Sequence, residues 1–283
     1  MTYLFIDGGY LRTSFKDCMS RYHSEEVDCS IRATTNALHQ LHALSAIPEK
    51  MFYYDCVDER RDGNESDEQL ARRVKAQEDR FNLIRDAPGW HVREGRLVGA
   101  RKGVRQRQKP VDILLAVEML SHAFNKNMHE AILIAGDDDF TPLVEELLRH
   151  GTYVQVLSDR RSGSLHLMHT ADVGRRMGYP FYWHLTPIGF QKEHPLPDDA
   201  SVAFNVDGGR RVEYGICEAG EKVEIFESGG VFHFCVPRER NMVSKVRARD
   251  LRMLRAYLEY EFSERNLLPE EWKPFNSATH ALE

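Results

Sequence analysis

The sequence predicts an α/β protein with a mainly parallel central sheet flanked by helices, followed by a small β-rich C-terminal domain with a helix. Short apolar runs alternate with amphipathic segments up to about residue 185, which is the rhythm of βαβ units. The apolar runs do not alternate with polar residues, as is typical of strands buried on both faces. After about Pro187 the chain changes to short apolar segments separated by Gly turns.

The first strand is expected in TYLFID, an apolar run that stops at Asp7 and is followed by two glycines. Four further apolar runs are expected to be strands, and the run starting at Gly89 could also form a hairpin. They are KMFYYDCV (50–57), GWHVREGRLVG (89–99), EAILIAG (130–136) and TYVQVLS (152–158). A last strand is expected in PFYWHL (180–185).

Helices are expected between these strands, because the intervening segments carry apolar residues at helical spacing. They follow Asp7 and then cover 29–46, 66–87, 109–124, 141–151 and 162–174. Ser66 and Gln69 form a capping-box pattern at the start of one helix. Thr141 is expected to cap the helix that ends at Gly151.

The domain boundary is expected near residue 187, so the predicted domains are 1–187 and 188–283. The segment 186–201 is rich in Pro, Gly and charged residues, as linkers often are. Several short strands with Gly turns are expected in 201–237, followed by an amphipathic helix over 245–268.

Composition predicts a soluble, cytoplasmic protein. No apolar run approaches the roughly 18 residues of a membrane span, and the N-terminus reads as a strand and not as a signal peptide. The five cysteines form no CxxC pair, which argues against a zinc site or a disulfide framework. The formal net charge of −6 argues against a protein that coats nucleic acid by bulk charge.

Carboxylates follow two of the expected strands. Asp7 ends the first, and Asp137 and Asp139 follow AILIAG, while Asp112 lies at the start of an apolar helix. Ligands of open α/β sheets bind outside the carboxyl ends of the strands, so these side chains are expected to share a crevice. Oxygen ligands favour Mg²⁺ or Mn²⁺, and such a centre suits phosphodiester hydrolysis. Each aspartate alone could instead be a turn residue or a helix-terminal charge.

The order of these motifs resembles the NYN domain of the LabA/DUF88-like proteins, a branch of the PIN-like nuclease superfamily. The resemblance rests on FIDGGYLR, KPVDILLAVEML, ILIAGDDDFTPLVEELLRHGTYVQVL and SGSLHLMHTAD, and it covers about residues 1–185. It implies a PIN-like Rossmannoid fold and a metal-dependent ribonuclease. The family's acidic metal-binding positions match Asp7, Asp112, Asp137 and Asp139, and the family's tendency to pair implies a candidate homodimer.

The chain departs from the family pattern at two places. Many members have Asn shortly after the first Asp, where this chain has Gly9 and Tyr10. Many also have Asp where this chain has Glu118, six residues after Asp112 and therefore about 120° round a helix. Glu118 is for this reason only an additional candidate acid or ligand.

The segment 92–110 is strongly basic and leads directly into Asp112. Arginine contacts phosphate through two parallel hydrogen bonds, so this segment is predicted to follow an RNA or single-stranded backbone, although a solvated loop would look the same. The predicted nucleic-acid-binding residues are Arg101, Lys102, Arg105, Arg107 and Lys109.

The predicted function is a divalent-metal-dependent ribonuclease that hydrolyses RNA phosphodiester bonds with a metal-activated water. The expected partners are an RNA substrate, single-stranded or structured, and a second copy of the chain, with no membrane. One alternative is a non-catalytic nucleic-acid-binding or regulatory module that retains the acidic cluster. Another is a phosphatase or a DNA nuclease that uses the same carboxylates.

Overall fold

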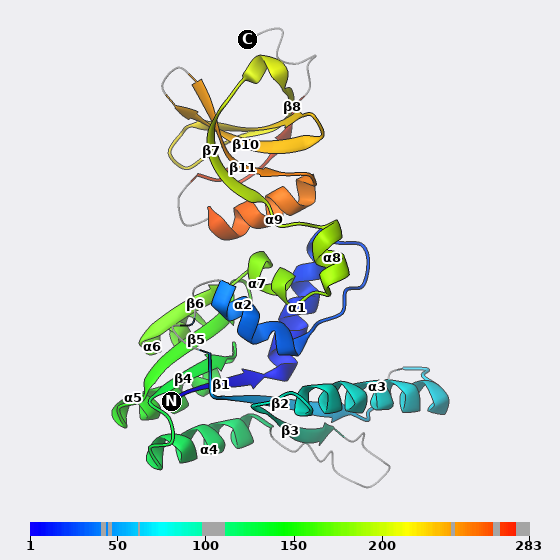
Figure 1. Ribbon diagram of the computed structural model, residues 1–283, viewed down its shortest axis with the longest axis vertical. Helices are drawn as coiled ribbons and strands as arrows, with labels where there is room; N and C mark the ends of the chain where they lie inside the picture. Colours follow the sequence, from blue (N-terminus) through cyan, green and yellow to red (C-terminus); the bar gives the residue numbers. More distant parts are fainter. Residues whose placement is uncertain are drawn as a thin grey trace. The chain divides into compact units, whose positions relative to one another are not determined.

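The computed structural model describes residues 1–40, 44, 47–61, 63–97, 111–238, 241–262 and 267–275 (Figure 1). The chain forms two compact units. The first contains Met1–Cys18 and Cys29–Leu185, and the second contains Met19–Asp28 and Thr186–Glu283.

The first unit is built on a six-stranded sheet in the order β3-β2-β1-β4-β5-β6, with all neighbouring strands parallel. The strands are β1 (Thr2–Asp7), β2 (Lys50–Asp58), β3 (Trp90–Leu97), β4 (Glu130–Ile134), β5 (Tyr153–Asp159) and β6 (Val173–Met177). The strand order reverses between β1 and β4, so the two carboxyl ends at that point flank the crevice where open α/β sheets bind ligands. This architecture confirms the predicted α/β class.

Seven helices follow the described strands or lie between them. They are α1 (Gly8–Tyr22), α2 (Thr34–Gln40), α3 (Asp67–Arg85), α4 (Val111–Phe124), α5 (Thr141–Arg149), α6 (Leu165–Thr170) and α7 (Tyr179–His184), with short 3₁₀ turns at Ile31–Ala33 (η1) and Asp138–Phe140 (η2). Figure 1 shows α4 and α5 on one face of the sheet and α1 and α2 on the other. The predicted capping box is confirmed at α3, where Ser66 Oγ accepts from the Gln69 N–H and the Gln69 side chain accepts from the Ser66 N–H.

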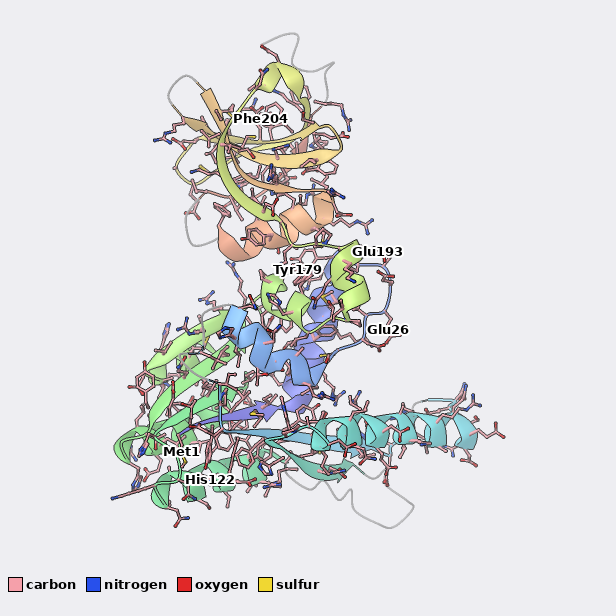
Figure 2. All side chains as sticks on the ribbon, viewed as in Figure 1. Met1, Glu26, His122, Tyr179, Glu193 and Phe204 are labelled. Carbon is pink, nitrogen blue, oxygen red and sulfur yellow. The ribbon has the colours of Figure 1, made fainter. Side chains whose placement is uncertain are left out.

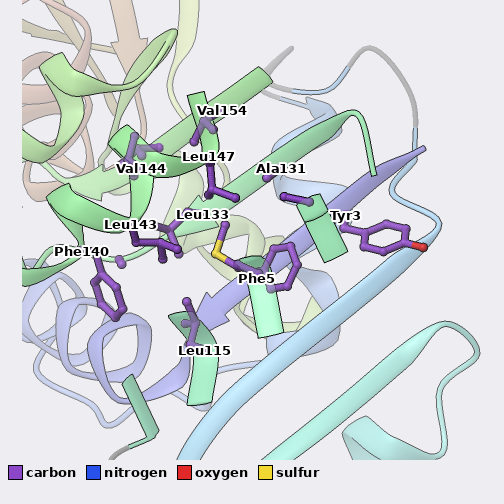
Figure 3. Packing of buried hydrophobic residues seen from close by; sticks show 14 of the residues in the cluster. Tyr3, Phe5, Leu115, Ala131, Leu133, Phe140, Leu143, Val144, Leu147 and Val154 are labelled. Atoms are coloured by element: carbon purple, nitrogen blue, oxygen red, sulfur yellow. The ribbon is translucent and has the colours of Figure 1, made fainter. Parts of the chain in front are cut away.

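A buried core under α4 and α5 holds the strand ends in place. Figure 3 shows Phe5, Leu133 and Val154 from three strands packed with Leu115 and Leu147 from the two helices. Burying each such side chain contributes about 1.5–3 kcal/mol. At the edge of this core the ring of His122, labelled in Figure 2, meets Tyr3 edge-on, with centroids 5.2 Å apart. This packing fixes β1 and β4, the strands that lead into Asp7 and Asp137.

Two local predictions in this unit are wrong. Residues 180–184 form most of helix α7, where Pro180 occupies the first turn and is tolerated because no N–H is needed there. The sixth strand is VGRRM, an edge strand whose arginines obscure its pattern. At α5, Thr141 is not the cap: Asp137 caps the preceding η2 turn by accepting the Asp139 N–H.

The second unit contains a six-stranded antiparallel sheet in the order β12-β8-β9-β10-β11-β7. Its elements are α8 (Ile188–Glu193), β7 (Asp198–Phe204), η3 (Val206–Gly208), β8 (Arg210–Ile216), β9 (Lys222–Ser228), β10 (Val231–Arg238), β11 (Asn241–Ala248), α9 (Leu251–Glu261) and β12 (Lys273–Pro274). Ile225, Phe234 and Val246 pack with Leu254 and Leu258 of α9 in a common core. The predicted β-rich C-terminal domain with a helix is therefore confirmed as a class.

The C-terminal helix begins later than the sequence suggested. Residues 245–248 belong to β11, which pairs with β10, and α9 begins after Asp250, whose side chain accepts from the Met253 N–H at 3.0 Å. Lys245 and Arg247 therefore do not share a helix with Arg252 and Arg255. Within the described ranges, no helix combines the length and apolar character needed to cross a membrane.

Candidate active site

Asp7 occupies the carboxyl end of β1, at the switch point of the sheet. Its Oδ1 accepts the Tyr10 N–H at 3.0 Å, so the first turn of α1 orients the carboxylate. Burial raises the pKa of Asp7 to about 6, and the nearby charges of Asp112 and Asp55 add to this effect. A positive charge placed here would favour the ionised form.

The three consecutive aspartates follow β4 and are all exposed, but they differ in their contacts. Asp138 accepts hydrogen bonds from Ser164 at 2.5 Å and Thr141 at 3.2 Å, which tie it to the neighbouring helices. Asp137 caps η2 by accepting the Asp139 N–H, and the side chain of Asp139 has no hydrogen bond or ion pair with any described residue. Asp138 therefore serves the fold, while Asp137 and Asp139 keep carboxylate oxygens available.

Asp112 lies in the first turn of α4 and is exposed. Partial burial raises its pKa, and the charges of Asp137 and Asp139 raise it further. The carboxylates from β1, α4 and the turn after β4 thus act on one another electrostatically, although they come from three distant stretches of sequence.

The chemistry of this donor set fits a hard divalent cation, because all four side chains offer only oxygen. In the arrangement seen here, however, no three His, Cys, Asp or Glu side chains of the described ranges lie close enough together to hold one ion. Asp112 raises the pKa of Asp7, and Asp137 and Asp139 raise the pKa of Asp112, so negative charge is concentrated at this edge.

Glu118 has other partners. Arg93 of β3 donates to it from Nη2 at 2.6 Å and from Nε at 2.8 Å, and the Tyr54 hydroxyl donates at 2.8 Å. Partial burial raises the pKa of Glu118, but the hydrogen bonds from Arg93 and Tyr54 outweigh it, and the net pKa is lowered. Glu118 is therefore the anchor of a polar network that joins α4 to β2 and β3.

Tyr10, in the segment where the sequence departs from the family pattern, has a packing role beside the acidic turn. Its hydroxyl accepts the Asp159 N–H at 2.6 Å, and its ring lies over Gly136, immediately before Asp137. A Cβ at position 136 would come within 2.1 Å of this ring, so only glycine fits there. Tyr10 thus packs against the turn that carries Asp137.

Gly136→Ala is expected to destabilise the protein by about 1–3 kcal/mol, the usual cost of overpacking a filled site. The physical reason is the collision with the Tyr10 ring. Urea unfolding of Gly136→Ala, Tyr10→Ala and the double variant would measure it. In the Tyr10→Ala background the extra methyl should cost much less, and equal costs in both backgrounds would contradict this account.

The predicted nucleic-acid-binding residues Arg101, Lys102, Arg105, Arg107 and Lys109 lie outside the described residues.

A pocket of about 690 Å³ adjoins Asp7 and Asp112, and sequence reasoning missed it. Besides these two aspartates it is lined by residues of α1, the end of β2 and the segment after it, α3 and the start of α4. These are Gly9, Arg12, Lys16, Tyr54, Asp55, Cys56, Asp58, Arg60, Arg73, Ala76, Gln77, Arg80 and Val111. Cations and carboxylates therefore share one pocket.

Asp55 is the second feature that was missed. Its side chain is 3% exposed and accepts two hydrogen bonds from Arg12, Nε at 2.7 Å and Nη2 at 2.8 Å, and one from the Tyr53 hydroxyl at 2.6 Å. The sequence did contain a signal for Asp55, because a carboxylate inside an apolar strand is expected to be buried and must then be paired. Its partner could not be read from the sequence, because Arg12 lies more than forty residues earlier.

A parallel sheet of this order, with acidic side chains at its switch point, places the chain among the Rossmann-like α/β proteins that include the PIN-like nucleases. The chain belongs to the NYN domain family, whose model matches residues 2–174. The narrower resemblance to the LabA/DUF88-like branch stays a prediction.

Among solved structures, the chain is similar to a protein of unknown function from Vibrio parahaemolyticus. The identity is 17% and the TM-score 0.42, over 64% of this chain and 94% of the other. The comparison with curated proteins gives no match.

Proposed function

We propose that this protein is a divalent-metal-dependent ribonuclease that hydrolyses RNA phosphodiester bonds. The observation that supports the proposal is the concentration of carboxylates at the switch point of an NYN-family sheet, where Asp112 raises the pKa of Asp7, and Asp137 and Asp139 raise the pKa of Asp112. A carboxylate whose pKa is raised by burial and by neighbouring negative charge is favoured in its ionised form when a cation is added.

Asp7, Asp112, Asp137 and Asp139 would hold Mg²⁺ or Mn²⁺. When bound, such an ion polarises a phosphoryl oxygen and lowers the pKa of water. The carboxylate of Asp7 would be a ligand of fixed orientation, because it accepts the Tyr10 N–H. Asp112 and Asp139 are exposed and can turn toward a common point.

The proposed substrate is RNA, single-stranded or structured, and the proposed compartment is the cytoplasm. All five cysteines are free thiols, which suits a reducing environment. The homodimer implied by the resemblance stays a prediction.

Asp139→Asn is expected to reduce Mn²⁺-dependent cleavage of a labelled RNA by about 100-fold or more, since metal ligation supplies several kcal/mol to the transition state. Asp138→Asn is the matched control, because it changes an adjacent aspartate that is engaged by Ser164 and Thr141. It should cleave at a rate close to that of the native protein. Gel analysis of cleavage with Mn²⁺ and with EDTA would measure both.

Two results would count against this assignment. Equal loss of cleavage in Asp139→Asn and Asp138→Asn would show that both changes act by disturbing the fold of the turn. A native protein that neither cleaves RNA nor gains thermal stability with Mn²⁺ would favour the non-catalytic binding module. Labelled single-stranded DNA and nucleotides in the same assay would separate a DNA nuclease or a phosphatase from a ribonuclease.

A further inference from the structure

The pocket beside the acidic edge contains three cations that keep N–H groups no described carboxylate engages. Arg60 and Arg73, by contrast, are engaged by the carboxylates of Asp58 and Glu65. The remaining three cations are Arg12 and Lys16 of α1 and Arg80 of α3. They come from two helices and meet only in the folded chain.

Arg80 is the most informative of the three. Its Nε and Nη2 atoms are buried and have no hydrogen-bond partner among the described residues. The guanidinium carbon lies 5.9 Å from the centroid of the Phe81 ring, which attracts the charge but accepts no in-plane N–H. A buried N–H without an acceptor is unfavourable, and more so when the group is charged. Arg80 is therefore a candidate contact for a ligand that supplies an acceptor.

The two neighbouring cations extend the same site. Lys16 is exposed and makes no ion pair with the described part of the chain. Arg12 uses Nε and Nη2 for Asp55, which leaves Nη1 for a ligand. A planar guanidinium and an ammonium group on adjoining helices match the tetrahedral oxygens of a phosphate.

We propose that the α1–α3 end of this pocket binds a phosphate group of the substrate other than the one that is cut. This inference rests on the proposed function for the identity of the substrate. Asp7 and Asp112 line the same pocket, so a phosphate held by Arg80 and Lys16 would keep the rest of an RNA chain against the carboxylates. The phosphate could also come from a free nucleotide, which offers the same oxygens.

The test is binding in EDTA, where no cleavage occurs. The probe is a short 3′-fluorescein oligouridylate, followed by anisotropy at several salt concentrations. Arg80→Met should weaken binding about tenfold, as expected for a charged hydrogen-bonded contact, and Lys16→Met should weaken it a few-fold. Each should reduce the salt slope by about 0.7, the value for one phosphate contact on a single strand.

Arg72→Met is the matched control on α3, because Arg72 is 77% exposed and pairs with Glu68 outside the pocket. It should change neither the affinity nor the salt slope. Arg80→Met should also melt at or above the temperature of the native protein, since it removes a buried charge without an acceptor. Inorganic phosphate should raise the melting temperature of the native protein more than that of Arg80→Met.

The outcomes are distinct from those of the cleavage assay. Unchanged binding in Arg80→Met, or equal weakening in Arg72→Met, would overturn the phosphate site even if cleavage is confirmed. A large drop in the melting temperature of Arg80→Met would also overturn it, by showing that the arginine supports the fold. Displacement of the probe by uridine monophosphate at concentrations near those of the oligonucleotide would support the site and assign it to a free nucleotide.

Discussion

Asn in place of Asp7 is expected to abolish metal-dependent cleavage and, at the same time, to stabilise the metal-free protein at neutral pH. Burial raises the folded-state pKa of Asp7 to about 6, above its ordinary value. Asparagine removes the buried charge and keeps an oxygen that can accept the Tyr10 N–H. Loss of a carboxylate ligand should cost about 100-fold or more in rate.

The stability effect has a defined pH window. Between about pH 4 and 6 the folded protein holds a proton on Asp7 that the unfolded chain has released. The free energy of unfolding therefore falls as the pH rises through this range, by about 3 kcal/mol at most. The full stability is present below pH 4, and the loss is complete above pH 6. Asp7→Asn should lack this loss and exceed the native protein in stability at pH 7.

Urea unfolding from pH 4 to pH 8 with EDTA would measure this difference. Asp138→Asn is the control, and it should lower the stability at neutral pH where Asp7→Asn raises it. The hydrogen bond from Ser164 lowers the pKa of Asp138, so its ionised carboxylate stabilises the folded protein. Added Mn²⁺ should raise the melting temperature of the native protein above pH 6 and leave Asp7→Asn unaffected. Parallel pH profiles for the two proteins would show that Asp7 ionises normally.

The parts of the fold that the sequence predicts best are those set by local patterns. Four predicted apolar runs, each bounded by turn residues, are strands of the parallel sheet, namely β1, β2, β4 and β5. Strand β6 could not be predicted from the sequence, because an edge strand needs apolar residues at few positions and so lacks the apolar run of a central strand. The segment 180–185 was misread because aromatic residues suit a strand and a buried helix alike.

The candidate site also has a part that the sequence predicts and a part that only the folded chain shows. The four aspartates could be proposed together because strand ends of a parallel sheet meet at one edge. The pairing of Glu118 with Arg93 could not be predicted, since it depends on which strand lies opposite α4. The pocket of Arg12, Lys16 and Arg80 has no sequence motif, because helices α1 and α3 are brought together only by the sheet order.

Asp55→Ala is expected to have the largest effect on stability of any single change near the site. The Asp55 carboxylate accepts from Arg12, from the Tyr53 hydroxyl and from the Cys56 N–H, and its side chain is 3% exposed. Removing it leaves a guanidinium and a buried hydroxyl without their acceptor, and breaking a buried pair in this way costs about 3–5 kcal/mol. Urea unfolding at pH 7 measures the loss.

The matched control is Asp58→Ala, three residues further along β2. Asp58 also pairs with an arginine, but the side chains of Arg60 and Asp58 are 48% and 32% exposed, so the pair should contribute at most about 1 kcal/mol. The double variant Arg12→Met with Asp55→Leu should recover much of the loss, because apolar side chains replace a buried ion pair without leaving a charge behind. If Asp55→Ala and Asp58→Ala cost the same, burial of the Arg12–Asp55 pair has no energetic consequence. If instead only Asp55→Ala is costly, this pair is what fixes α1 to β2 and so holds Arg12 and Lys16 beside the carboxyl end of β1.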